Sequence, residues 1–156
     1  MKVIFLDIDG VVNCNSTKEM FNGYIFVEDK KVEMIKQIVD ATGAKIVLSS
    51  TWRYGWEDDD SCCPLYPEFQ ALRDKFKSFG MEFISKTPMD PRGYRGNEIH
   101  AWLQRWGGEP IESFVILDDD NDMKPYGSKL VQTSWLKGIE DKHVKRAIKM
   151  LMEGED

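Results

Sequence analysis

The sequence predicts an α/β fold, a three-layer Rossmann-like arrangement in which a parallel sheet carries helices on both faces. Short apolar runs rich in β-branched residues alternate with segments whose apolar residues recur at helical spacing. The connections are short, and strands that alternate with helices in this way pair in parallel. With 156 residues, 42% of them hydrophobic and 31% charged, the chain is expected to form one soluble domain over residues 1–156.

The first half of the chain opens with a buried strand at residues 2–6, a short apolar run that ends in Asp-Ile-Asp-Gly. Asparagines and a glycine at 12–27 predict a loop or small hairpin. Apolar residues at helical spacing predict a helix from Glu28 to a stop at Gly43. After a strand at 44–48, residues 50–66 show no periodicity and predict a long loop, of a kind that tends to be functional or mobile.

The second half repeats the alternation of helix and strand. Its helices are predicted where apolar residues recur every three or four positions, and glycines end the first two of them. Its strands are short apolar runs. In chain order the predicted elements are a helix at 69–79, a strand at 81–84, a helix at 99–106, a strand at 113–117, a short strand at 130–131 and a helix at 144–152.

Charge and composition limit the classes of function. The formal charge of −6, from 21 basic and 27 acidic residues, argues against broad nonspecific binding to nucleic acid, which needs a basic surface. It does not exclude local binding of one phosphate end. No apolar run approaches the roughly 20 residues that span a bilayer, and no signal peptide is evident, so we expect a cytoplasmic protein with no membrane partner.

Carboxylates follow two of the predicted strands. Asp7 and Asp9 end the first strand, and period-two alternation places them ~7 Å apart on the same side. Asp118, Asp119 and Asp122 follow the strand at 113–117. Ligands of open α/β sheets bind outside the carboxyl ends of the strands, so these acids are predicted to meet there. Oxygen-only ligands with open water positions suit Mg²⁺.

Such a site is suited to phosphate chemistry. A divalent cation offsets the charge of both the carboxylates and a phosphorylated substrate. Two non-equivalent aspartates permit a division of labour, in which one ligates the metal and attacks phosphorus and the other moves the proton. Taken alone, each aspartate could instead simply cap a turn or a helix. The joint occurrence of the strand-end motifs is much more specific than any one of them.

Together these motifs resemble those of haloacid dehalogenase-like (HAD) superfamily phosphatases. Residues 5–12, Phe-Leu-Asp-Ile-Asp-Gly-Val-Val, match the first HAD motif, and Ile-Val-Leu-Ser at 46–49 matches the second. Arg95 fits the basic third motif, with Arg92 as a competitor. Residues 115–119 with Asp122 fit the acidic fourth motif.

More narrowly, the chain resembles the HAD domains associated with RNA repair proteins, and this similarity spans almost its whole length. The segments that carry it are Ser-Ser-Thr-Trp-Arg at 49–53, Arg-Gly-Asn-Glu-Ile at 95–99, the acidic run at 116–123 and the ending at 133–138.

The resemblance implies roles for the aspartates. Asp7 would be the nucleophile that forms an aspartyl-phosphate, and Asp9 would be the acid to the leaving group and the base to water. Mg²⁺ would be held by Asp7, the Asp9 carbonyl and Asp118, with Asp119 or Asp122 acting through water; the choice between the last two stays open.

The resemblance also implies a phosphate-binding set and an open site. Ser49, with Ser50 beside it, and Arg95 would hold the phosphoryl oxygens. Cap domains of HAD proteins are inserted within 11–44 or 50–94, and the predicted elements already use most of those residues. We therefore expect no substantial cap domain, as in relatives that often act on macromolecules or polynucleotide ends.

The function expected is a Mg²⁺-dependent phosphomonoester hydrolase that acts on nucleic-acid or nucleotide phosphate ends. Three alternatives stay open: a small-metabolite phosphatase for nucleotides or sugars, a metal-dependent nuclease, and a binding module without catalysis. The expected partner is a phosphorylated substrate, and the sequence makes no prediction of oligomeric state.

A cluster of aromatic and basic side chains follows Ser49. Trp52, Arg53, Tyr54 and Trp56 could stack on and clamp a base beside the phosphate. The alternative is a satellite core beneath the loop. We favour that alternative for Trp52 and leave both open for Trp56.

Overall fold

The computed structural model of the chain describes residues 1–153 and is built on a five-stranded parallel sheet in the order β5-β4-β1-β6-β7. The predicted domain end at 154–156 lies outside the described residues. The strands are β1 (Lys2–Leu6), β4 (Lys45–Leu48), β5 (Phe83–Lys86), β6 (Ser113–Asp118) and β7 (Leu130–Gln132). The helices are α1 (Asp29–Thr42), α2 (Pro67–Ser78), α3 (Arg95–Arg105) and α4 (Asp141–Glu153).

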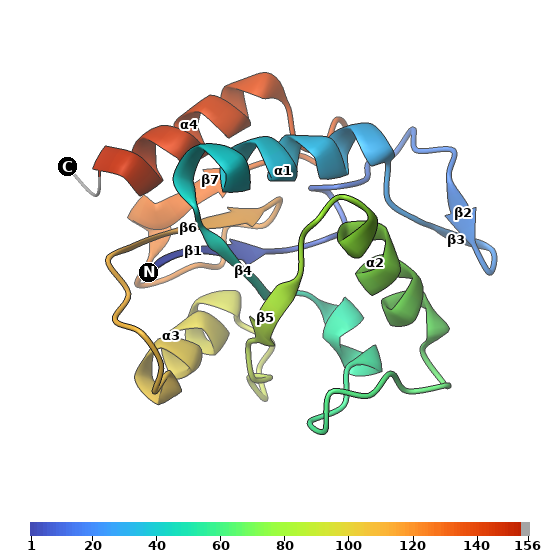
Figure 1. Cartoon of the computed structure of the whole chain (residues 1–156), viewed down its shortest axis with the longest axis horizontal. Coiled ribbons are helices and arrows are strands. Elements are labelled where there is room, and N and C mark those ends of the chain that lie inside the picture. Colours follow the sequence, from blue (N-terminus) through green and yellow to red (C-terminus); the bar gives the residue numbers. More distant parts are fainter. Residues whose placement is uncertain (154–156) are drawn as a thin grey trace.

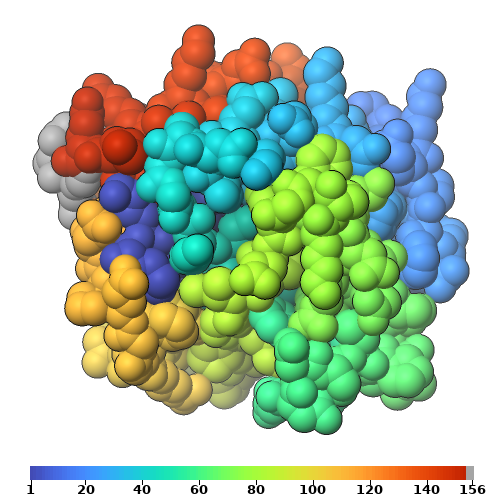
Figure 2. All heavy atoms as spheres, in the orientation of Figure 1, coloured from blue at the N-terminus to red at the C-terminus, as the bar shows by residue number. Residues whose placement is uncertain are grey.

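Helices cover both faces of the sheet, which confirms the predicted three-layer fold. Alternation along β1 sends Ile4 and Leu6 into the core beneath α1, α2 and α4, and sends Val3 and Phe5 toward α3. Figure 1 shows α1 and α4 side by side over one face and α3 on the other. In the space-filling view α1, α2 and α4 form one continuous surface, and atoms of the first residues (dark blue) are visible below it (Figure 2).

The insertions within the sheet are small. The hairpin predicted in 12–27 is present as β2 (Met20–Phe21) and β3 (Tyr24–Ile25). The prediction of an irregular loop at 50–66 is wrong over Thr51–Gly55, a 3-10 helix η1 in which the Trp52 N–H is capped by the Ser50 hydroxyl. Within the described residues no cap domain covers the carboxyl edge of the sheet, as expected from the sequence.

Three boundaries differ from the predictions. Strand β5 begins at Phe83 because the Met81 N–H still bonds to the Phe76 carbonyl in the turn that closes α2. Helix α3 begins at Arg95, because the N–H groups of Arg95 and Gly96 bond to Asp122 from a distant part of the chain. The same helix ends before Trp106 rather than at the glycine pair.

The strand register brings the predicted site residues to one edge. Leu6 pairs with Leu48 on one side and with Leu117 on the other. The backbone bonding continues one residue further, because the Asp7 N–H donates to the Leu117 carbonyl and the Ser49 N–H donates to the Leu6 carbonyl. Asp7, Ser49 and Asp118 therefore lie at three adjacent strand ends. Among residues 1–153, no helix is both long and apolar enough to cross a membrane.

Candidate active site

Three carboxylates meet at the carboxyl edge of the sheet. Asp7, Asp118 and Asp119 each offer an oxygen that lies within 4.8 Å of those of the other two. Asp7 and Asp118 are buried, and Asp119 is half-buried. The structure thus brings together acids from β1 and β6 that are 111 residues apart in the sequence, as the strand-end motifs predict.

The acid cluster is costly to ionise. Burial raises the pKa of Asp7 to about 6, and the neighbouring Asp119 and Asp9 add to the rise while Arg95 opposes it. Burial and the charge of Asp7 raise the pKa of Asp118 to about 9. Burial also raises the pKa of Asp119, assisted by Asp120 and Asp9. Without a cation, the cluster therefore holds protons that isolated aspartates would release.

Arg95 is the cation that the structure places at the cluster. Its Nη2 lies 3.6 Å from Asp7 Oδ1 and its Nε lies 3.8 Å from Asp118 Oδ2. Burial alone would lower the pKa of Arg95, but the surrounding carboxylates, Asp7 first, raise it. Arg92 is exposed on the loop before α3. Of the two arginines left open by the sequence, Arg95 therefore faces the acids.

The two predicted serines differ in what their hydroxyls do. The Ser49 side chain is fully buried, and its Oγ has no hydrogen-bond partner among the described residues. The Ser50 Oγ accepts the Trp52 N–H at 3.2 Å and so caps η1. Ser49 therefore has a hydroxyl to offer a ligand, whereas Ser50 shapes the segment that follows.

Asp9 lies at the exposed end of the site. Its Oδ1 accepts the Asn13 side-chain amide at 2.9 Å, and its Oδ2 accepts the Trp52 Nε1–H at 3.1 Å. Asp9 is outside the cluster formed by Asp7, Asp118 and Asp119. Two donors from different segments therefore fix the direction of this carboxylate, whose predicted task is to move a proton.

A tight turn at Gly10 follows the two aspartates of the first motif. Gly10 has φ +83°, in the region that glycine adopts without strain, and a Cβ there would overlap the Asp119 carboxylate. The Gly10 N–H donates to Asn13 Oδ1, and the Gly10 carbonyl accepts the Thr133 hydroxyl. The glycine thus lets the chain turn while Asp119 stays close to the end of β1.

Asp122 lies at the start of α3 rather than in the carboxylate cluster. Its Oδ2 accepts the Arg95 N–H at 3.2 Å, and its backbone carbonyl accepts the Gly96 N–H at 2.9 Å. A carboxylate is favourable at a helix N-terminus, where the N–H groups are unpaired. Of the two acids left open by the sequence, Asp119 is the one that shares the cluster with Asp7 and Asp118.

The donor set fits a hard divalent cation. The Oδ2 of Asp118 is buried without a hydrogen-bond partner among the described residues, in a cluster of three carboxylates. Buried polar atoms that lack a partner call for an explanation, and an ion is one of the usual ones. Oxygen ligands with few carboxylates suit Mg²⁺. Asp7, Asp118 and Asp119 are therefore the side chains that would hold it.

Glu98 is a buried residue of the site that the sequence analysis missed. Its Oε2 accepts from Arg53 Nη2 at 2.7 Å, and its Oε1 lies 3.7 Å from Arg95 Nη1. The Asp90 N–H also donates to Oε2 at 3.0 Å. Glu98 occupies a polar position within the amphipathic helix α3, and no local pattern distinguishes it from a solvated acid. It connects η1, α3 and the loop before α3 behind the guanidinium of Arg95.

The aromatic and basic cluster after Ser49 is divided by the structure. The hypothesis that Arg53 clamps a base is wrong, because its guanidinium is buried against Glu98. Trp56 is buried and stacks on Phe69, so the satellite-core alternative holds for it. Trp52 is half-buried beside Phe26, as favoured, but it also bonds to Asp9. Tyr54 is exposed.

A wide hollow opens beside Asp9 with a volume of about 730 Å³. It runs between the β2–β3 hairpin, η1 and the chain before α2, which lie on the same side of the molecule in Figures 1 and 2. We call it the aromatic groove and define it by Tyr24, Trp52, Tyr54, Leu65, Tyr66 and Trp135. Its volume lies within the usual range of small-molecule sites.

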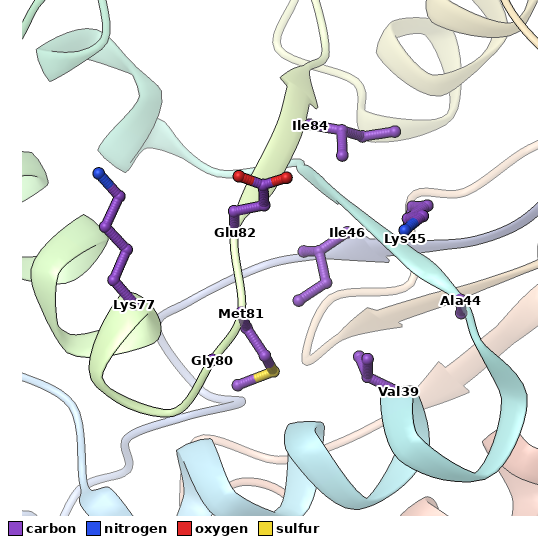
Figure 3. A pocket seen from close by; sticks show the side chains of 9 residues that line it. All are labelled: Val39, Ala44, Lys45, Ile46, Lys77, Gly80, Met81, Glu82 and Ile84. Carbon is purple, nitrogen blue, oxygen red and sulfur yellow. The ribbon is translucent and has the colours of Figure 1, made fainter.

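A second hollow, of about 320 Å³, lies at the opposite edge of the sheet. Its walls come from α1, α2 and the amino ends of β4 and β5 (Figure 3). Its charged side chains are Lys45, Lys77 and Glu82. Because the strands are parallel, this hollow lies at their amino ends, whereas the carboxylate cluster lies at their carboxyl ends. The hollow contains none of the predicted catalytic residues.

Comparison with known families matches residues 3–144 to the family described as HAD domain in Swiss Army Knife RNA repair proteins. Comparison with curated proteins and with solved structures gives no match. The matched segment includes β1, β4 and β6 and thus both acid-bearing strand ends.

Proposed function

The chain belongs to the family of HAD domains in Swiss Army Knife RNA repair proteins, and we propose that it is a Mg²⁺-dependent phosphomonoesterase. Membership of this family confirms the resemblance seen in the sequence and identifies the chain as a HAD-type hydrolase. The observation that carries the proposal is the placement of Asp7. This carboxylate lies in a cluster that suits a divalent cation and 3.6 Å from a guanidinium that can bind phosphate.

In the first step an Asp7 oxygen attacks phosphorus, and the bond from phosphorus to the leaving oxygen breaks. Asp9 donates a proton to that oxygen, which leaves as an alcohol. The product on the protein is an aspartyl-phosphate. The Ser49 hydroxyl and the Arg95 guanidinium hold the phosphoryl oxygens, since both have buried polar atoms without hydrogen-bond partners among the described residues.

In the second step Asp9 removes a proton from water, and the water oxygen attacks the phosphoryl group. The bond to the Asp7 oxygen breaks, phosphate leaves, and the free Asp7 carboxylate is restored. When bound by Asp7, Asp118 and Asp119, with the Asp9 carbonyl that the family pattern adds, Mg²⁺ supplies charge neutralisation for the acids and the phosphoryl oxygens.

The substrate proposed is a phosphate at a nucleic-acid end. Two features support it: the family description names RNA repair, and no cap domain encloses the site within the described residues. An open site admits a phosphate that is attached to a large molecule, whereas a sugar phosphate gains little from it.

The test compares hydrolysis of acetyl phosphate, p-nitrophenyl phosphate and 3′- or 5′-phosphorylated oligonucleotides in Mg²⁺ and in excess chelator. We expect turnover that depends on Mg²⁺ and is abolished in Asp7→Asn. A short reaction with labelled substrate, quenched in acid, is expected to leave labelled phosphate on the protein that hydroxylamine releases. Turnover retained in Asp7→Asn would refute the mechanism. Cleavage of phosphodiesters that survives this substitution would favour the nuclease.

A further inference from the structure

The aromatic groove is the place where exposed apolar side chains gather. Ten large hydrophobic residues are exposed among the described residues, and six of them line this groove. They are Met20, Tyr24, Tyr54, Leu65, Tyr66 and Trp135. A contiguous apolar surface of this kind marks a binding site more often than singly scattered residues do.

The groove is continuous with the catalytic site. Asp9 lines it directly, and Trp52 both lines it and donates its Nε1–H to Asp9. In the proposed reaction Asp9 gives its proton to the leaving oxygen. The group attached to that oxygen therefore extends from Asp9 into the groove, while the phosphoryl group faces Asp7.

The charge of the groove selects among possible occupants. The acidic side chains that line it are Asp9 and Glu68, and none of the described residues that line it is a lysine or an arginine. A phosphate backbone is attracted by cations and repelled by carboxylates. A nucleobase is planar and uncharged, and it stacks on aromatic rings. The groove therefore fits a base and not the continuing backbone of the chain.

We propose that the aromatic groove binds the unpaired base of the nucleotide that carries the scissile phosphate. The base stacks among the rings of Tyr54, Tyr66 and Trp135, and the sugar oxygen that carries the phosphate lies at Asp9. Tyr54 and Tyr66 lie with their ring centroids 6.1 Å apart and at 45° to one another, so their faces are not closed against each other. This inference rests on the proposed phosphatase function and adds to it a preference for a single-stranded end.

The test uses two phosphorylated oligonucleotides that differ only in the terminal nucleotide. One carries an ordinary base and the other an abasic analogue, and each is prepared with a 3′ or a 5′ phosphate so that the end hydrolysed faster can be compared. Base-to-aromatic stacking predicts a KM about 5-fold to 150-fold lower for the substrate with the base. Tyr66→Ala and Trp135→Ala are each expected to remove most of that difference in KM between the two substrates.

Three controls make the result decisive. Tyr66→Phe keeps the ring and is expected to retain the low KM for the substrate with the base. Met152→Ala is the matched control, because it removes an exposed apolar side chain on α4, outside the groove. Acetyl phosphate, which has no ring, reports the phosphatase reaction alone. No hydrolysis of acetyl phosphate overturns the proposed function. Hydrolysis of acetyl phosphate with equal KM for the two oligonucleotides, or a lower KM for a phosphotyrosine peptide, overturns only the base-binding groove.

Discussion

The two ends of the active site differ in how well their polar groups are satisfied. At the buried end, Asp7 and Asp118 lie together out of solvent, and Asp118 Oδ2 lacks a hydrogen-bond partner among the described residues. At the exposed end, Asp9 has a donor on each oxygen, Asn13 on one and Trp52 on the other. The buried end thus has a polar atom that can bind a ligand, whereas both carboxylate oxygens of Asp9 at the exposed end already have hydrogen-bond donors within the protein.

This difference places the stability cost of the site at its buried end and the choice of substrate at its exposed end. Burial of like charges raises the pKa values of Asp7 and Asp118, so ionising them in the absence of a cation destabilises the fold. No comparable cluster of carboxylates lines the aromatic groove. Substitutions at the buried end should therefore change stability and catalysis together, whereas those at the exposed end should change catalysis and substrate choice without relieving the cost of burying like charges.

The largest effect is expected from Asp7→Asn. The amide cannot attack phosphorus, so kcat should fall by at least about 1,000-fold. Because the pKa of Asp7 is raised to about 6, the uncharged amide should also raise Tm in chelator near pH 7.5. Asp9→Asn is the control: it should lose activity by about 100-fold or more and should not raise Tm, because its amide can accept from only one of the two donors, Asn13 and Trp52. A lower Tm for Asp7→Asn in chelator would contradict the cost assigned to the buried end.

The second effect concerns the ion pair behind Arg95. Glu98→Gln leaves the buried Arg53 guanidinium without its counter-charge, and breaking a buried pair costs about 3–5 kcal/mol. At about 2–4 °C per kcal/mol for a chain of this size, Tm should fall by about 10 °C. Glu112→Gln makes the same change in the exposed pair with Lys2 and should leave Tm nearly unchanged. Equal effects on Tm would show that burial of the pair is unimportant.

The third effect is the pH dependence of metal-free stability. The folded pKa of Asp7, about 6, and that of Asp118, about 9, lie above the ordinary value of 3.8, so the folded state binds more protons than the unfolded state. The stability that these two groups contribute should therefore be fully present below about pH 4 and be lost as pH rises through 6 toward 9. The loss follows because each tenfold difference in proton affinity between the folded and unfolded states is worth about 1.4 kcal/mol.

Mg²⁺ should oppose this loss of stability at high pH. Its binding adds stability to the folded state and competes with the protons held by the carboxylate cluster. Thermal denaturation at about pH 5 and pH 8, with Mg²⁺ and with chelator, measures both effects. We expect the stabilisation by Mg²⁺ to be larger at pH 8. Metal-free protein that is more stable at pH 8 than at pH 5 would show that ionising the carboxylate cluster does not destabilise the fold.

The parts of the site that the sequence predicts are those fixed by strand ends. Asp7 and Asp118 each end a short apolar run, and parallel pairing brings such ends to one edge whatever the intervening chain does. The helix stops at Gly43 and Gly80 are predicted because glycine takes the positive φ that the turn requires. Local chemistry and sheet topology are sufficient for both.

The parts that the sequence does not predict depend on contacts between distant segments. The partners in the Arg53–Glu98 pair are 45 residues apart, and each is polar in a segment that local patterning places at the surface. The role of Trp52 as a donor to Asp9 depends on η1 lying close to Asp9, 43 residues earlier in the chain, which no periodicity encodes. Asp122 likewise takes its place from the start of α3, 27 residues earlier in the chain.

The smallest effect tests the exposed end at that Trp52 contact. Trp52→Phe keeps an aromatic ring beside Phe26 and removes the N–H that bonds to Asp9 Oδ2 at 3.1 Å. An intramolecular hydrogen bond is worth about 0.5–1.5 kcal/mol, so kcat for acetyl phosphate should fall by up to about tenfold with little change in KM. Trp56→Phe removes a matched N–H that bonds to Asp60 and should leave kcat unchanged. Equal losses of kcat in both variants would mean that general packing, rather than the direction of the Asp9 carboxylate, sets the rate.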